Sequence, residues 1–420
     1  MKPCLALFLA SLLVLLSGCI AMDCSASGTD PVSDSAVLVL EGSGTVVYAD
    51  DAESTLTAEQ EHLLLSFFDR WYQSLAQLEA EDLSEFFCDS HQADYSAAAL
   101  DLQVGIRQAQ PLDYTLTGYS FVLEVESVAE NEDGSIRVRL SEDCVQNFAA
   151  LPGVDSKRFD TSHTFVMQQE GDGWLIRNHS QFDPLVSTLL YAYMEEYADG
   201  QWDPERFRGL DFTQDYIDAV PSYLEQVVEQ AELRQQQAAE ETTAQAAEEP
   251  YDREAAVAYA DQWIEERSGD WADYTGSGGN CQNYASQVLY AGGIPMDIQG
   301  DYIWKWYDDT VSNRGVAWGR SSSWSGVKQF IDYAAGNTGY GLAAEVDAPY
   351  DTGEPGDLIH MGVDSDWRHT VVITQPVSDG SGQVVDYLVD SNTANLQDYP
   401  ASLYGYTDQI LVHILGWNQN

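Results

Sequence analysis

Apolar residues in the first half of the chain change from helical spacing to strict alternation. Large apolar side chains recur at helical spacing between Leu56 and Leu78, which predicts an amphipathic helix. Alternating runs then predict strands at Ser120–Ser127, Ser135–Leu140 and His163–Gln168. Asp-Gly turn signals between and after these runs indicate antiparallel hairpins. A helix followed by antiparallel strands predicts an α+β domain at residues 55–195.

A polar stretch separates this domain from the rest of the chain. Residues 196–250 begin with helical spacing, but no large apolar residue follows Leu233 before Pro250. The run is rich in Gln, Ala and Glu and cannot build a core of its own. We predict a solvated helical linker that ends at Pro250.

The apolar pattern starts again in residues 251–420, which hold eight of the 11 Trp residues. Amphipathic spacing predicts helices at Ala255–Glu266 and Gln282–Ala291. The strands predicted after them are Asp357–Ile359, Thr370–Thr374, Val384–Val389 and Ile410–Leu415. We expect a second α+β domain, with helices packed on an antiparallel sheet, that folds by itself.

The N-terminal residues have the pattern of an export signal. Lys2 precedes the apolar run Leu5–Leu16, which is shorter than the roughly 20 residues that span a bilayer. The order Leu-Ser-Gly-Cys that ends at Cys19 resembles a bacterial lipoprotein lipobox. This resemblance implies that residues 1–18 are removed and that Cys19 carries a lipid; an ordinary secretory signal is the alternative. Residues 19–54 are then expected to be a flexible tether to the outer face of the cell membrane.

The charge balance excludes one class of partner. The chain has 69 acidic residues, 18 basic residues and a formal net charge of −51. This charge repels nucleic-acid phosphates and anionic lipid headgroups, and the sequence has no basic patch to offset it. We therefore expect no nucleic-acid partner, and contact with a membrane only through the lipid anchor.

Cys281 is the candidate nucleophile of the second domain. If Cys4 is removed with the signal and Cys19 is acylated, Cys281 has no partner within its domain, whereas Cys88 and Cys144 could pair. A glycine-rich loop leads into the predicted helix whose first turn holds Cys281. The N–H groups and the dipole at such a helix start are expected to lower the pKa of the thiol and to supply part of an oxyanion hole.

A thiolate nucleophile needs a base that can also protonate the leaving amine, and histidine is the usual choice. The domain offers His360, His369 and His413. We favour His369, because it begins an apolar strand after a polar loop, so that its ring can face a cleft. The following strand ends in polar residues, and Asp390 is predicted to orient the imidazole, with Asn392 as the alternative.

Five separated segments of the second domain resemble a known family. In order they are "YDREAAVAYADQW", "GGNCQNYASQVLYAGGIPM", "SSSWSGVKQFIDY", "GDLIHM" and "RHTVVIT", and they resemble the putative amidase domain of exported Firmicute proteins. That family is akin to the NlpC/P60-like and CHAP papain-like cysteine hydrolases. The resemblance implies a papain-like fold, Cys281 as nucleophile and His369 as base, with a polar third residue on the next strand. The sequence departs from the family at Asn280 and Gln282, where Asp-Cys-Thr is commoner, and around Asp390, where a His-Thr pair often precedes the acid.

The first domain, which ends in "GDGWLIRN", resembles the NTF2-like α+β fold by its pattern alone. Such a domain can serve as an enzyme, a binding module or a spacer, and we favour a spacer or a binding module.

These features lead to the hypothesis of an extracellular, lipid-anchored cysteine hydrolase that cleaves an amide bond in a peptide of the cell wall. The wall is suggested by the anchor and by the family kinship. The alternatives are a catalytically inactive papain-like scaffolding lipoprotein, or an acyl transferase in which an amine resolves the thioester. No His-Glu-x-x-His, Cys-x-x-Cys or Gly-rich phosphate loop occurs in the sequence, and we expect neither a metal nor a cofactor.

Overall fold

The computed structural model describes residues 41–50, 52, 54–181, 217–219, 247–299, 302–307 and 319–420. The predicted signal, the predicted acylation site Cys19, the tether up to residue 40 and most of the predicted linker lie outside these residues. Among the described residues, no helix combines the length and the apolarity that crossing a membrane requires.

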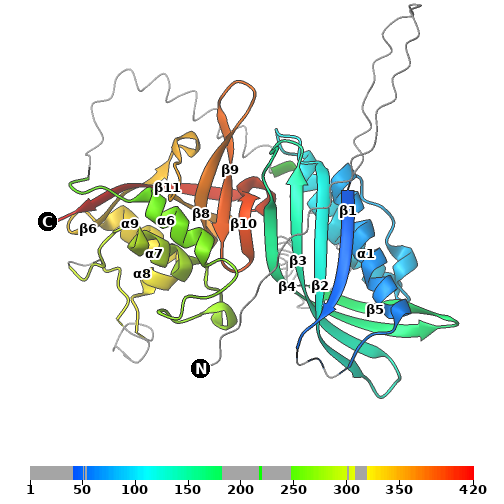
Figure 1. Ribbon diagram of the computed structural model, residues 1–420. Helices are drawn as coiled ribbons and strands as arrows, with labels where there is room; N and C mark the ends of the chain where they lie inside the picture. The colour runs from blue at the N-terminus through cyan, green and yellow to red at the C-terminus, as the bar shows by residue number, and fades with distance from the viewer. Residues whose placement is uncertain are drawn as a thin grey trace, which may run out of the picture. The chain divides into compact units, whose positions relative to one another are not determined.

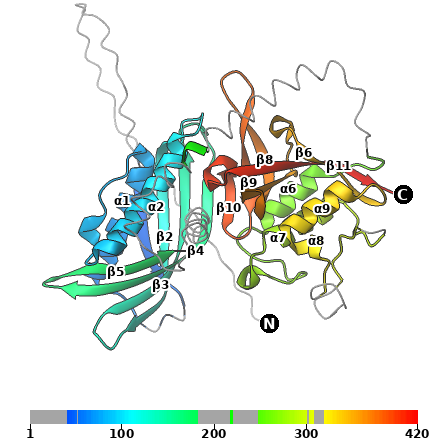
Figure 2. The same ribbon diagram turned by 180° about the vertical axis from the view of Figure 1, so that it is seen from behind.

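The first domain packs two helices against a sheet of long strands (Figures 1 and 2). Antiparallel pairing joins β2 to β3, β3 to β4 and β4 to β5, as the predicted hairpins require. Its elements are β1 (Glu41–Tyr48), α1 (Ala58–Gln77), the short helix η1 (Ser84–Phe86), α2 (Ser90–Gln108), β2 (Leu116–Glu130), β3 (Ile136–Phe148), β4 (Ser156–Glu170) and β5 (Gly173–Gln181).

Helix α1 confirms the helix predicted from apolar spacing. Thr57 and Gln60 form a capping box at its start, and its apolar stripe is buried against the sheet. The tether prediction is wrong for residues 41–48, because this segment forms β1 and pairs in parallel with β2. Its β-forming residues from Thr45 to Tyr48 gain backbone hydrogen bonds there. Helix α2 was not predicted, because its sequence has no regular apolar stripe.

The second domain places its helices on an antiparallel sheet with the strand order β10-β9-β8-β7-β11-β6 (Figure 1). Its α+β class is as predicted, and each of the four predicted strands is present, although β6 and β10 were missed. The helices are α6 (Arg253–Gln262), η2 (Thr275–Ser277), α7 (Cys281–Ala291), α8 (Ser322–Ser325), α9 (Val327–Gly336), η3 (Tyr350–Thr352) and η4 (Ala401–Tyr404). The strands are β6 (Gly341–Ala348), β7 (Leu358–Val363), β8 (Asp366–Ser378), β9 (Val384–Ser391), β10 (Asn395–Pro400) and β11 (Asp408–Asn418).

Side chains of this sheet alternate between two apolar clusters. Leu358, Val372 and Val412 pack with residues of α6, α7 and α9 in one cluster. Ile359 and Val371 belong to the other cluster, which also contains the core of the first domain. The period of two residues in each strand therefore decides which side chains can reach α7.

The sheets of the two domains are continuous. Strand β10 pairs with β4, with Asn395 opposite Phe159, so that the described strands form one 11-stranded sheet. Ser156 Oγ also donates a hydrogen bond to the carbonyl oxygen of Asp398, at 2.6 Å. Because the two halves share a sheet and an apolar cluster, we no longer expect residues 251–420 to fold alone.

A buried carboxyl group anchors this junction. Asp386 on β9 is 1% exposed and accepts hydrogen bonds from the hydroxyls of Tyr114 and Ser402, both at 2.5 Å. The backbone N–H groups of Tyr387 and Ser402 donate to it as well. Burial raises the pKa of Asp386, although all four donors act in the opposite direction.

We predict that Tyr114→Phe destabilises the whole chain by about 1–3 kcal/mol, because it takes one donor from a buried carboxyl group. The denaturant midpoint should fall with an unchanged m-value in chemical unfolding. Tyr302→Phe, at a side chain that is 45% exposed, serves as the control and should leave the midpoint unchanged. A Tyr114→Phe protein as stable as the wild type would show that this bond does not join the domains.

Candidate functional site

The nucleophile candidate lies at the start of α7, as predicted. Gly278 and Gly279 have φ values of 104° and 107°, a region that residues with a Cβ atom rarely adopt, and Asn280 occupies the N-cap position. Cys281 is the first residue of the helix. The two glycines therefore allow the loop to turn directly into α7.

The electrostatics of the thiol differ from the prediction. Cys281 is 7% exposed, and burial raises the pKa of its thiol. Backbone N–H groups of Thr370, Gln282 and Cys281 itself act in the opposite direction, as expected at a helix start. The predicted fall in the pKa is wrong, because the loss of hydration outweighs these donors.

Strand β8 supplies the contacts of α7 with the sheet. The hydroxyl of Thr370 donates a hydrogen bond to Gln282 Oε1, at 2.9 Å, so the Thr370 side chain points toward α7. His369 is its neighbour in the strand, and neighbouring side chains point to opposite faces. The backbone N–H of Thr370, which acts on the Cys281 thiol, is next to His369 along the strand, and no described hydrogen bond joins the sulfur to the imidazole.

The imidazole of His369 lies among aromatic rings. Its centroid is 5.4 Å from that of Tyr404 and 6.2 Å from that of Tyr406, whose plane is inclined to it by 17°. The side chain is 4% exposed, and its Nε2 atom has no hydrogen-bond partner among the described residues. Burial lowers the pKa of His369 to about 4, so the ring is neutral at physiological pH.

The structure gives Asp390 other partners than His369. Its Oδ1 atom accepts a hydrogen bond from the backbone N–H of Asp398, at 3.0 Å. Burial raises the pKa of Asp390 well above its usual value, and the carboxyl group of Asp261 adds to this shift. No described contact brings Asp390 to the imidazole, so the three predicted residues do not form a connected triad here.

Asn392, the alternative third residue, also has described hydrogen-bond partners other than His369. It forms side-chain hydrogen bonds with Asn280 and with the carbonyl oxygens of Trp263 and Ile264. These contacts place it beside the loop that leads to the nucleophile.

The other two histidines of the domain have structural partners. His360 is fully buried, and its Nδ1 atom lies 2.9 Å from the hydroxyl of Thr370. Because that hydroxyl donates to Gln282, we assign the proton to Nδ1 of His360. Burial, with a smaller effect of His369, lowers the pKa of His360 to about 3. His413 pairs with Asp357 at 2.6 Å, and this contact raises its pKa.

Sequence reasoning missed the side chains that surround the two candidate residues. Thr370 and Gln282 connect β8 to α7, while Tyr404 and Tyr406 enclose the imidazole. The only sequence signal was the adjacency of Gln282 to Cys281 and of Thr370 to His369. The two tyrosines lie far along the chain in and after η4, and no motif connects them to β8.

The described part of the chain shows neither a metal centre nor a disulfide. No group of three or more His, Cys, Asp or Glu side chains there could hold a metal ion. Cys88 and Cys144 are both free thiols, so they do not form the disulfide that the sequence left open.

Residues 250–415 match a family model described as "Putative amidase domain", which covers about two fifths of the chain. No curated protein and no solved structure matches the chain. The match supports amide hydrolysis at a coarse level. The papain-like and NTF2-like folds remain predictions from the sequence.

The buried imidazole predicts a loss of stability in acid. The pKa of His369 falls from 6.5 to about 4 on folding, so the unfolded chain binds a proton more readily than the folded protein. The contribution of the neutral ring to the free energy of unfolding is therefore complete above pH 6.5 and is lost as the pH falls toward 4. At about 1.4 kcal/mol for each pKa unit, this loss amounts to about 3 kcal/mol. Urea unfolding at several pH values should show a smaller acid loss for His369→Gln than for the wild type. Equal losses for the two proteins would contradict the burial of a neutral ring.

Proposed function

We propose that the chain is a cysteine hydrolase of amide bonds, with Cys281 as nucleophile and His369 as general base. One observation carries the proposal: the thiol stands at the start of α7 within reach of three backbone N–H groups, in a domain that matches an amidase family model. Such donors stabilise both a thiolate and the oxyanion of a tetrahedral intermediate.

The two shifted pKa values define the starting state of the reaction. The raised pKa keeps the Cys281 thiol protonated at neutral pH, and the lowered pKa keeps His369 able to accept a proton. The sulfur attacks the amide carbonyl carbon as its proton passes to the imidazole. The imidazolium then protonates the leaving amine, and water hydrolyses the thioester. The mechanism requires the sulfur and a ring nitrogen to approach when substrate binds, as catalytic hydrogen bonds often do.

In this proposal the orientation of the imidazole comes from aromatic contacts. Tyr404 and Tyr406 enclose the ring, and the hydroxyl of Tyr404 is fixed by Ser391 at 2.7 Å. Burial favours the neutral form of the Asp390 carboxyl group, whereas an orienter stabilises an imidazolium as a charged carboxylate. Asp390 as orienter therefore remains a prediction of the sequence that mutation can decide.

One observation favours the alternative of an inactive binding module. No described hydrogen bond joins the Cys281 sulfur to an imidazole, and burial disfavours the thiolate. A scaffold that has lost catalysis would have the same features.

We predict that Cys281→Ala and His369→Ala each abolish hydrolysis of peptide amides, since they remove the nucleophile and the base. His360→Ala should lower stability but leave measurable turnover in the folded fraction, because that ring packs on Phe330 of α9 and bonds to Thr370 of β8. The assay is release of amine from a peptide library, with circular dichroism to confirm folding.

Several outcomes would contradict these assignments. Full activity of Cys281→Ala would refute the mechanism, and loss of activity in His360→Ala alone would move the base to His360. If Asp390→Ala lowers kcat by roughly two to four orders of magnitude in a folded protein, the carboxyl group acts as the orienter after all.

We further propose that the substrate is a cell-wall peptide and that the enzyme is exported and anchored by a lipid on Cys19. Support comes from the Leu-Ser-Gly-Cys order and from the family resemblance. Cys19→Ser should release the protein from the membrane fraction into the medium, and mass spectrometry of the wild type should find a diacylglyceryl group on Cys19. An unmodified N-terminus at another residue would refute the anchor.

A further inference from the structure

Asn280, the residue before the nucleophile, is the centre of a buried hydrogen-bond network. It is 2% exposed, and its Nδ2 atom donates to Asn392 Oδ1, at 2.9 Å. Its Oδ1 atom accepts from the backbone N–H of Tyr274 at 3.1 Å and from Asn283 Nδ2 at 2.8 Å. Its own backbone N–H donates to Thr393 Oγ1, at 3.1 Å.

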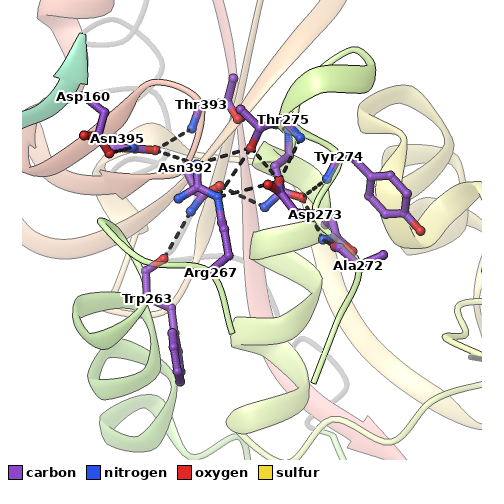
Figure 3. Close-up of polar contacts among 12 residues, drawn as sticks. Asp160, Trp263, Arg267, Ala272, Asp273, Tyr274, Thr275, Asn392, Thr393 and Asn395 are labelled. Carbon is purple, nitrogen blue, oxygen red and sulfur yellow. Dashed lines mark hydrogen bonds and ion pairs between the residues drawn. The ribbon is translucent and has the colours of Figure 1, made fainter. Parts of the chain in front are cut away.

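Asn392 is held in place from its other side. Its Nδ2 atom donates to the carbonyl oxygens of Trp263 and Ile264, at 3.1 and 3.3 Å. Figure 3 shows Asn392 between Trp263 on one side and the segment of Ala272 to Thr275 on the other. This orientation leaves the Oδ1 atom of Asn392 to accept from Asn280, so the amide of Asn280 cannot turn without losing a buried partner.

Because of these bonds, the Asn280 side chain does not cap α7. Asn is among the best N-cap residues because its side-chain oxygen normally accepts a hydrogen bond from an N–H group in the first turn. Asn280 occupies the N-cap position, yet its side chain makes no such bond. Its oxygen accepts from Tyr274 and Asn283 Nδ2 instead, and the backbone N–H groups of Cys281 and Gln282 act to lower the pKa of the Cys281 thiol.

We propose that Asn392 holds the Asn280 side chain away from the first turn of α7, so that the N–H groups there remain available to the Cys281 sulfur. Both residues are positioning residues that act through α7. The thiol part of this inference is independent of the proposed function. Its extension to the oxyanion of an amide intermediate rests on that function.

The first test compares the alkylation of Cys281 by iodoacetamide, followed by peptide mass spectrometry, over roughly pH 6 to 10. In Asn392→Leu, Asn280 Nδ2 loses its buried acceptor, so the side chain can exchange its bonds to Tyr274 and Asn283 for a cap on α7. The midpoint of the alkylation profile should rise by about one pH unit, and the rate at pH 7 should fall about tenfold. The double variant Asn280→Ala with Asn392→Leu cannot cap α7 in this way and should recover most of the wild-type rate.

Asn395→Ala is the matched control. Asn395 belongs to the same polar cluster, where its Oδ1 atom accepts from Arg267 and from the backbone N–H of Thr393 (Figure 3). No described hydrogen bond joins it to Asn280. Its alkylation profile should equal that of the wild type. An equal slowing in Asn395→Ala, or a double variant as slow as Asn392→Leu, would overturn the inference in favour of a general loosening of the loop.

A second pair of variants decides the question if Asn392→Leu does not fold. Asn280→Ser and Asn280→Ala both lose the bond to Asn392, but only serine can cap a helix. We expect Asn280→Ser to be alkylated about tenfold more slowly than Asn280→Ala, with the higher midpoint. Identical profiles for the two proteins would refute the inference. Amide turnover measured on the same samples separates the two proposals, because a wild type without turnover would disprove only the enzyme function.

Discussion

The contact between the start of α7 and strand β8 is the constraint on which the candidate site depends. Thr370 faces α7 and binds Gln282, and its backbone N–H acts to lower the pKa of the Cys281 thiol. Strand alternation then places His369 on the opposite face, among tyrosines. The position of the thiol, its donors and the surroundings of the imidazole all follow from this one packing arrangement.

Burial and backbone donors act on the thiol in opposite directions. The interior raises the pKa of Cys281, and the N–H groups at the start of α7 partly offset that effect. A side-chain cap on α7 would take up one of those N–H groups. The bond of Asn280 to Asn392 therefore has its largest effect on the thiol pKa in a buried site. The site thus couples the reactivity of a sulfur to the hydrogen bonds of a neighbouring amide.

The first domain contributes to the surroundings of the catalytic candidates. Arg107 of α2 lies 3.5 Å from the hydroxyl of Tyr399, whose ring is 6.0 Å from that of Tyr404, and Tyr404 packs on His369. The pairing of β4 with β10 fixes the strand that carries Tyr399. A domain that the sequence suggested as a spacer or binding module is therefore also part of the core that supports the imidazole.

The sequence by itself determined the features that depend on local pattern. Apolar period predicted α1, α6, α7 and the four strands, and the glycine pair before Asn280 predicted the loop into the helix of Cys281. The family resemblance from motifs agrees with the match to residues 250–415. These features could be predicted because hydrogen-bond period and turn geometry are properties of neighbouring residues.

Only the tertiary structure decided the features that depend on burial and on contacts distant in sequence. Residues 41–48 became a strand because β2 offered an unpaired edge, and the first domain joined the second through β4 and β10. Tertiary packing also decided three features of the site: the rise in the pKa of Cys281, the tyrosines around His369 and the bond of Asn392 to Asn280. Desolvation and side-chain partners are set by the packing of segments that lie more than a hundred residues apart, as Asn280 and Asn392 do, and no local pattern records that packing.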